Sequence, residues 1–242
     1  MKIGMSRDAL LNREKLCFDV LNSLGSANYV LVGGYAVSSF DFPRLSVDLD
    51  LVIQESEINT IKHILESRGF SKTEELSGFD QVYSGKFERY KISSQLPVAV
   101  DLLINAIKSR QTNFSYSFDY LMKNSEVREV RGWAQGLKSL NRIVDKELLL
   151  ALKINSMRIS DKRDVIALCY SLPNTEKVFN HIKNCNKEII LANLNSLLEM
   201  LTNEKYKDSI KGVFSIPDKI LERTINNCKN VLESLFVLLN KI

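Results

Sequence analysis

Two aspartates, Asp48 and Asp50, have a spacing that could support shared chemistry. They alternate with three apolar residues, Val47, Leu49 and Leu51. Because side chains on a β-strand alternate in direction, both carboxylates are expected to project from one face. Two like charges this close repel each other unless a cation lies between them, and hard carboxylate oxygens suit Mg²⁺ or Mn²⁺. We therefore expect a metal site, and the structural alternative is a pair of solvated aspartates on an edge strand.

A third carboxylate, Asp101, interrupts a second apolar segment, PVAVDLLIN. An unpaired charge in such a segment would be costly, so its presence requires a reason. If its strand neighbours the strand of Asp48 and Asp50, the three aspartates converge on a site for two divalent cations about 4 Å apart, which supports in-line displacement at phosphorus. The alternative is a structural, turn-proximal Asp101 that pairs with a lysine or an arginine.

The glycine pair Gly33-Gly34 lies directly after the apolar segment YVLV. Glycine lets the backbone turn tightly and leaves N–H groups accessible at the start of a short helix, a geometry that receives phosphate oxygens. Arg44 and Ser46 precede the aspartates and could add a guanidinium and a hydroxyl to the same phosphates. Arg44 follows Pro43, so a loop-capping role is the alternative. No GxxxxGK[ST] segment occurs, which disfavours a P-loop ATPase.

Together these motifs resemble the DNA polymerase β-type nucleotidyltransferase superfamily, whose pattern is a glycine pair, a DxD strand and a third strand-borne carboxylate. Within it, the chain is most similar to the AbiEii and MenT-type toxin nucleotidyltransferases, because residues 143–168 resemble their helix-borne lysine followed by an Arg-Asp pair. The resemblance implies catalytic metal ligands at Asp48, Asp50 and Asp101. It implies nucleotide contacts at Gly33, Gly34, Arg44 and Ser46. It adds Lys153 and Asp164 as catalytic residues, and Lys153 also as a nucleotide contact.

The same resemblance implies an α/β (α+β) fold, in which a mixed β-sheet flanked by helices over residues 1–142 precedes a helical C-terminal domain over residues 143–242. It implies transfer of a nucleoside monophosphate from an NTP such as ATP to an acceptor hydroxyl, with Mg²⁺ or Mn²⁺ as cofactor. The implied acceptor is a tRNA 3′ end, and the implied setting is a toxin-antitoxin or phage-defence pair with an antitoxin protein as partner. The open alternatives are a protein or a small-molecule acceptor, such as an aminoglycoside, and a non-catalytic binding module.

Residues 145–157 can also be interpreted without the resemblance, because their apolar positions have a helical spacing that predicts a buried amphipathic helix. Lys153 interrupts this pattern. Its side chain either extends to solvent or points into the expected active-site cleft, where its charge would bind the triphosphate. Asp161 and Asp164 open the next helix, where unpaired N–H groups favour carboxylates. Asp164 could instead orient Lys153 or Arg163.

Apolar periodicity and the positions of glycine and proline predict the elements that hold these residues. Helices are expected over residues 7–24, ended by Gly25, and from a cap at Ser56 to about Arg68. Strands are expected over 29–32, 47–53, 70–76, 81–92 and 97–104, with Gly78 and Pro97 as punctuation, and a hairpin over 127–142. From residue 143 onward the pattern is helical, with Pro173 and Pro217 at helix starts.

Composition limits the remaining possibilities. The 242 residues, 45% of them hydrophobic, suffice for one large domain or two small ones, and a net charge of +4 does not by itself indicate a nucleic-acid binder. No stretch approaches the roughly 18 apolar residues of a membrane span, and MKIGMSRDAL has no apolar signal core, so neither membrane insertion nor secretion is expected. The four cysteines show no CxxC spacing, which argues against zinc and favours reduced thiols in the cytoplasm.

Overall fold

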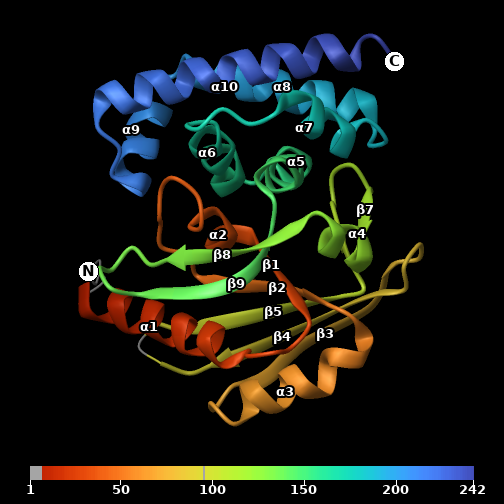
Figure 1. Cartoon of the computed structure of the whole chain (residues 1–242), viewed down its shortest axis with the longest axis vertical. Helices are drawn as coiled ribbons and strands as arrows, with labels where there is room; N and C mark the ends of the chain where they lie inside the picture. The colour runs from red at the N-terminus through yellow and green to blue at the C-terminus, as the bar shows by residue number, and fades with distance from the viewer. Residues whose placement is uncertain (1–6, 95) are drawn as a thin grey trace, which may run out of the picture. The chain divides into compact units, whose positions relative to one another are not determined.

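The computed structural model describes residues 7–94 and 96–242, and it shows a mixed α/β chain (Figure 1). A seven-stranded mixed sheet flanked by helices precedes a helical C-terminal region, so the predicted fold class is confirmed. The chain forms two compact units. The first covers the described parts of residues 1–39, 43–107 and 115–144, and the second covers residues 40–42, 108–114 and 145–242. Residues 1–6, which belong to the N-terminal segment without an expected signal core, lie outside the described part.

The sheet contains the strands β1 (Tyr29–Val32), β2 (Asp48–Ile53), β3 (Ser71–Asp80), β4 (Gly85–Ile92), β5 (Val98–Ile104), β8 (Ser125–Arg131) and β9 (Lys138–Val144). Their order is β3-β4-β5-β2-β1-β9-β8. Strand β2 pairs in parallel with β5 and β1 pairs in parallel with β9, while the other neighbours are antiparallel. A strand from late in the chain therefore lies beside β1, the first strand.

The aspartates occupy one face of the sheet, and the other face carries much of the first unit's core. Leu49, Leu51 and Leu102 are fully buried. They alternate with Asp48, Asp50 and Asp101 along β2 and β5. Because a strand places successive side chains on opposite faces, burial of these leucines orients the aspartates to the other side.

The first unit contains the helices α1 (Arg7–Ser23), α2 (Gly33–Val37), α3 (Ile58–Glu66) and α4 (Phe118–Lys123), with a 3₁₀ turn η1 (Glu55–Glu57) before α3. Helix α2 directly follows β1, as predicted. Gly25 and Gly69 have φ values of +53° and +82° after α1 and α3, which explains why these helices end there. The predicted cap at Ser56 is wrong, because Ser56 lies inside η1 and Glu57 is the N-cap residue of α3.

Two predictions, one about a glycine and one about a proline, have different outcomes, and one segment had no prediction. Gly78 does not separate two strands but lies inside β3, where its φ of +73° coincides with a register shift against β4. Pro217 is the N-cap residue of α10 (Asp218–Leu239), as predicted. Residues 106–123, for which no element was predicted, form the two short strands β6 (Ala106–Lys108) and β7 (Ser115–Ser117) as well as α4.

The second unit is a bundle of α5 (Lys146–Ser156), α6 (Ile159–Leu168), α7 (Thr175–Ile182), α8 (Lys187–Leu201), α9 (Glu204–Phe214) and α10. Helix α5 packs against α6, α7 and α8, and α10 packs against α7 and α8. Six of the eleven residues of α5 are apolar and fully buried or nearly so, and the amphipathic helix predicted here is in fact surrounded by other helices. Within the described residues, no helix has both the length and the apolar character that crossing a bilayer requires.

Candidate active site

Strand pairing brings the three predicted aspartates onto neighbouring positions of one sheet face. In the parallel pair of β2 and β5, Asp50 lies opposite Asp101 and Asp48 lies opposite Ala99. Because Asp48 and Asp50 are two residues apart, all three carboxyl groups leave the same face. The strands of the aspartates are therefore direct neighbours, which was the condition for their convergence.

The glycine pair packs directly against Asp50, Ser46 and Arg44, which were expected to share a site with it. A Cβ atom at Gly33 would lie 1.8 Å from Oδ2 of Asp50. A Cβ atom at Gly34 would lie 2.3 Å from Oγ of Ser46 and 2.8 Å from Nη2 of Arg44. Both approaches are too short for any other residue type, so the glycines make room for the carboxylate, the hydroxyl and the guanidinium at the start of α2.

The segment between α2 and β2 is held by its own hydrogen bonds. Arg44 donates its backbone N–H to Oγ of Ser38 over 3.2 Å, and the Ser38 hydroxyl donates to the Arg44 carbonyl over 3.1 Å. The Arg44 side chain donates from Nη1 to the carbonyl of Leu45 over 3.0 Å. Arg44 thus has the loop contacts expected of a cap, and its Nη2 also lies beside Gly34, so the two sequence interpretations of this residue are compatible.

Asp101 is paired with an arginine that the sequence did not single out. Arg89 on β4 lies opposite Asp101 in the register and donates from Nε and Nη2 to both carboxylate oxygens, each over 2.7 Å. Its Nη1 donates to Glu74 on β3 over 3.2 Å, and its guanidinium lies 5.5 Å from the centre of the Phe87 ring. The arginine partner of the alternative interpretation is therefore present, but its turn-proximal position is wrong, because Asp101 lies in the middle of β5.

Charge around Asp48 is only partly compensated. Burial raises the pKa of Asp48, and the neighbouring Asp101 carboxylate raises it further. Arg89, Arg13 and Lys91 act in the opposite direction without cancelling the effect. An additional cation at this face would relieve the repulsion between the carboxylates.

The residues at this face partly fit a divalent cation. Carboxylate oxygens are the hard ligands that Mg²⁺ and Mn²⁺ prefer, and Asp48 and Asp50 present them from one face. Both oxygens of Asp101 are bound to Arg89, and no group of three or more His, Cys, Asp or Glu side chains within residues 7–94 and 96–242 could hold a metal ion. The oxygen chemistry of the three aspartates therefore suits a divalent cation, but in this structure the Asp101 carboxylate is held by Arg89.

Lys153 and Asp164 lie together in the second unit. The Lys153 ammonium on α5 is 2.8 Å from Oδ2 of Asp164 and 2.9 Å from Oδ1 of Asp161, both on α6. All three side chains are buried, so the interpretation in which Lys153 extends to solvent is wrong. Asp164 contacts Lys153 as proposed from the sequence, whereas the predicted contact of Lys153 with a nucleotide stays a prediction.

Asp161 combines this ion pair with a role at the helix start. It accepts hydrogen bonds from the backbone N–H of Arg158 over 3.1 Å and from the Arg158 Nε over 2.8 Å. Burial raises the pKa of Asp161, but the Lys153 ammonium and Arg158 outweigh that effect and lower the pKa to about 2. The carboxylate thus stays charged inside the helical unit.

Adding one methyl group at Gly33 is expected to disturb the site specifically. In Gly33→Ala the new Cβ would overlap Oδ2 of Asp50, so Asp50 must move. Gly78→Ala is a matched control, because its φ of +73° resembles the +69° of Gly33 while a Cβ there would meet no atom within 4 Å. Backbone strain should cost each variant about 1–2 kcal/mol, and overpacking should cost Gly33→Ala a further 1–3 kcal/mol or so. Urea unfolding measures both, and equal losses would contradict the close packing of Gly33 on Asp50.

Comparisons with known proteins give only distant structural likenesses. No protein-family model and no curated protein matches the sequence. JHP933 from Helicobacter pylori has 17% identity, a TM-score of 0.48 and coverage of 98% of this chain and 96% of its own. A candidate nucleotidyltransferase from H. pylori has 18% identity, a TM-score of 0.47 and coverage of 98% of both chains. The STING-associated c-di-GMP synthase CdnE from Capnocytophaga granulosa has 11% identity, a TM-score of 0.26 and coverage of 98% and 84%. A functional assignment therefore has to be based on the residues of this chain.

Proposed function

We propose that this chain is a metal-dependent nucleotidyltransferase that transfers a nucleoside monophosphate from an NTP to an acceptor hydroxyl. The observation that carries the proposal is the strand register, which places Asp50 opposite Asp101 and Asp48 on the same face. The Gly33-Gly34 pair adds support, because it packs against Asp50, Ser46 and Arg44. This combination matches the glycine pair, DxD strand and third carboxylate of the DNA polymerase β-type superfamily.

Each residue of the group has a defined task in such a reaction. Asp48, Asp50 and Asp101 would hold Mg²⁺ or Mn²⁺, which when bound supplies Lewis-acid activation and neutralises triphosphate charge. Arg44 and Ser46 can donate hydrogen bonds to phosphate oxygens, with Gly34 leaving room for both side chains. The acceptor oxygen bonds to the α-phosphorus while the bond to the pyrophosphate leaving group breaks, and the hydroxyl proton passes to a carboxylate of this face.

The acceptor and the biological setting are proposed from the sequence resemblance alone. A tRNA 3′ end is the first acceptor to test, and an antitoxin protein is the first partner to test. A protein hydroxyl and a small molecule such as an aminoglycoside are the other acceptor classes. Within the same fold, the pairing of Asp101 with Arg89 favours a second candidate function, a non-catalytic binding module that needs no metal at this face.

Incubation of the purified protein with Mg²⁺, each radiolabelled NTP in turn, and total tRNA tests this proposal. We expect label to enter the tRNA with at least one NTP and to be lost when a chelator removes the metal. Label in protein or in a small molecule would keep the reaction and replace the acceptor. If no NTP gives label in any fraction and calorimetry detects no Mg²⁺-dependent NTP binding, the enzymatic function is wrong and the binding module is favoured.

A further inference from the structure

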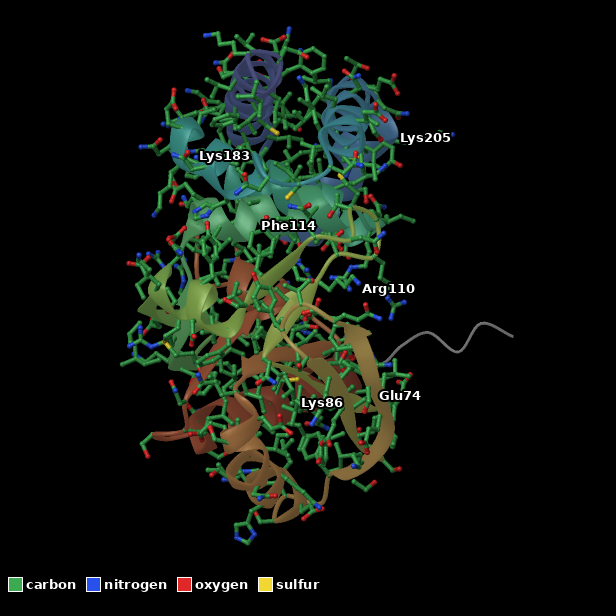
Figure 2. The ribbon with its side chains drawn as sticks, turned by 90° about the vertical axis from the view of Figure 1, so that its right-hand side faces the viewer. Glu74, Lys86, Arg110, Phe114, Lys183 and Lys205 are labelled. Carbon is green, nitrogen blue, oxygen red and sulfur yellow. The ribbon has the colours of Figure 1, made fainter. Side chains whose placement is uncertain are left out.

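Four charged side chains form a row across four neighbouring strands. In the register, Glu74 of β3 lies opposite Arg89 of β4, Arg89 lies opposite Asp101 of β5, and Asp101 lies opposite Asp50 of β2. Figure 2 shows Glu74 on its outer strand. The charges along this row are negative, positive, negative and negative. The single cation, Arg89, therefore has a carboxylate on each side.

Arg89 divides its hydrogen bonds unequally between these two carboxylates. It makes a bidentate pair with Asp101, both bonds at 2.7 Å, and one longer bond of 3.2 Å to Glu74. The Asp101 side chain is 9% exposed and the Glu74 side chain is 45% exposed. A buried carboxylate depends on its cation more than an exposed one does, because water cannot replace the partner. Arg89 therefore stabilises Asp101 first, and Glu74 is a second acceptor within reach.

A divalent cation and Arg89 compete for the same oxygens of Asp101. The bidentate pair occupies the lone pairs of both carboxylate oxygens that face β4, so a cation that binds Asp101 from that side must displace the guanidinium. Withdrawal toward Glu74 requires no new partner, because the Nη1 bond to Glu74 is already present. Asp48 and Asp50 lie on the same face of the sheet as Asp101, so a cation bound here would be close to the Arg89–Asp101 pair.

We propose that Arg89 is a positioning residue that holds Asp101 in the metal-free protein and shifts its hydrogen bonds to Glu74 when a divalent cation binds. This inference rests on the proposed function. It assigns Arg89 a task that the sequence pattern does not include, which is to compensate a buried carboxylate until the cation arrives. The same contact raises the cation concentration that the site requires, because binding must first break the ion pair.

Titration of the purified protein with Mn²⁺ alone tests this proposal, without any nucleotide or activity measurement. Calorimetry on Arg89→Gln should give a Kd about tenfold lower than that of the wild type, because the competing charged hydrogen bonds are gone. The metal-free melting temperature should fall, and Mn²⁺ should restore more of it than in the wild type. Glu74→Gln should weaken Mn²⁺ binding several-fold, and it should have no effect on binding in the Arg89→Gln background.

Two further variants keep the result interpretable. Arg89→Lys retains the charge but not the bidentate geometry, so its Mn²⁺ affinity should lie between those of the wild type and Arg89→Gln. Arg128→Gln, on β8 at the opposite edge of the sheet, removes a similarly exposed arginine and should leave the affinity unchanged. Equal or weaker Mn²⁺ binding by Arg89→Gln would overturn the role of Arg89 and leave the proposed function intact. Absence of Mn²⁺ binding by every variant and by the wild type would overturn both.

Discussion

Replacing Asp48 by asparagine is expected to reduce nucleotidyl transfer by about a thousandfold or more while the protein stays folded. The amide keeps the shape of the side chain but loses its charge, and loss of a metal ligand removes several kcal/mol of transition-state stabilisation, at about 1.4 kcal/mol for each tenfold in rate. Initial rates of label transfer from the preferred NTP measure the effect. Asp50 should give the same result on substitution, because it shares the face with Asp48.

Stability measurements separate this effect from misfolding. Burial and Asp101 raise the pKa of Asp48, so the folded state holds the proton more tightly than the unfolded state. As pH rises from 3.8, the ordinary pKa of this carboxyl, through the raised pKa of the folded state, Asp48 becomes charged and the free energy of unfolding falls. Asparagine carries no charge, so the variant does not lose this stability. At neutral pH, Asp48→Asn should therefore be at least as stable as the wild type in urea.

Glu75→Gln is the matched control for the loss of a carboxylate. Glu75 lies on β3 with a side chain that is 52% exposed, and its partner is Lys72 at 2.6 Å. Its substitution should leave label transfer unchanged. If Asp48→Asn retains the activity of Glu75→Gln, the aspartate pair is not the reactive site.

Replacing Lys153 by methionine is expected to cost about 3–5 kcal/mol of unfolding free energy, because it leaves the buried Asp161 and Asp164 without their shared cation. Methionine retains most of the length of the side chain, so the loss reports the charge and not a cavity. Urea unfolding at neutral pH measures it. Lys162→Met is the control, because Lys162 is half-buried on the same helix as the two aspartates, and its ammonium donates to the Ser196 hydroxyl over 3.0 Å and forms no ion pair with any described residue.

The dependence of this loss on pH tests its cause. In the wild type the pKa of Asp161 is lowered to about 2, so its stabilising charge is present above 3.8 and is lost as pH falls from 3.8 through 2. Without Lys153 the buried carboxylate takes up a proton more readily. The gap between wild type and Lys153→Met should therefore narrow on acidification. A gap that is independent of pH, or no larger than that of Lys162→Met, would contradict the ion-pair explanation.

Local signals in the sequence were sufficient for most elements of the sheet unit. The strand over residues 29–32 and the end of α1 before Gly25 agree with the structure, because an apolar run and a glycine at positive φ act within a few residues. Residues 106–123 were missed, since β6 and β7 have three residues each and α4 has six, too few to show a period. Ser56 was misjudged as a cap because the 3₁₀ turn delays the helix start to Ile58.

The candidate site was predictable where its members share a strand or a turn. Asp48 and Asp50 share β2, and the glycine pair precedes the loop to that strand, so short-range spacing indicated their proximity. Arg89 could not be recognised in this way, because its partner is decided by the pairing of two strands. Once Ile92 is known to lie opposite Val98, counting three residues along each strand places Arg89 opposite Asp101. Sequence alone does not supply that starting pair.

The position of β9 has a consequence for how the protein is made. Leu31 of β1 pairs with Ile143 of β9, so the strand that leads into the glycine pair gains its second neighbour only after nearly the whole first unit has been synthesised. During translation β1 can pair with β2 but keeps its other edge bare, and such edges bind chaperones or other chains. Residues 138–144 must therefore leave the ribosome before the sheet can be completed, and until then this edge of β1 is open to other chains.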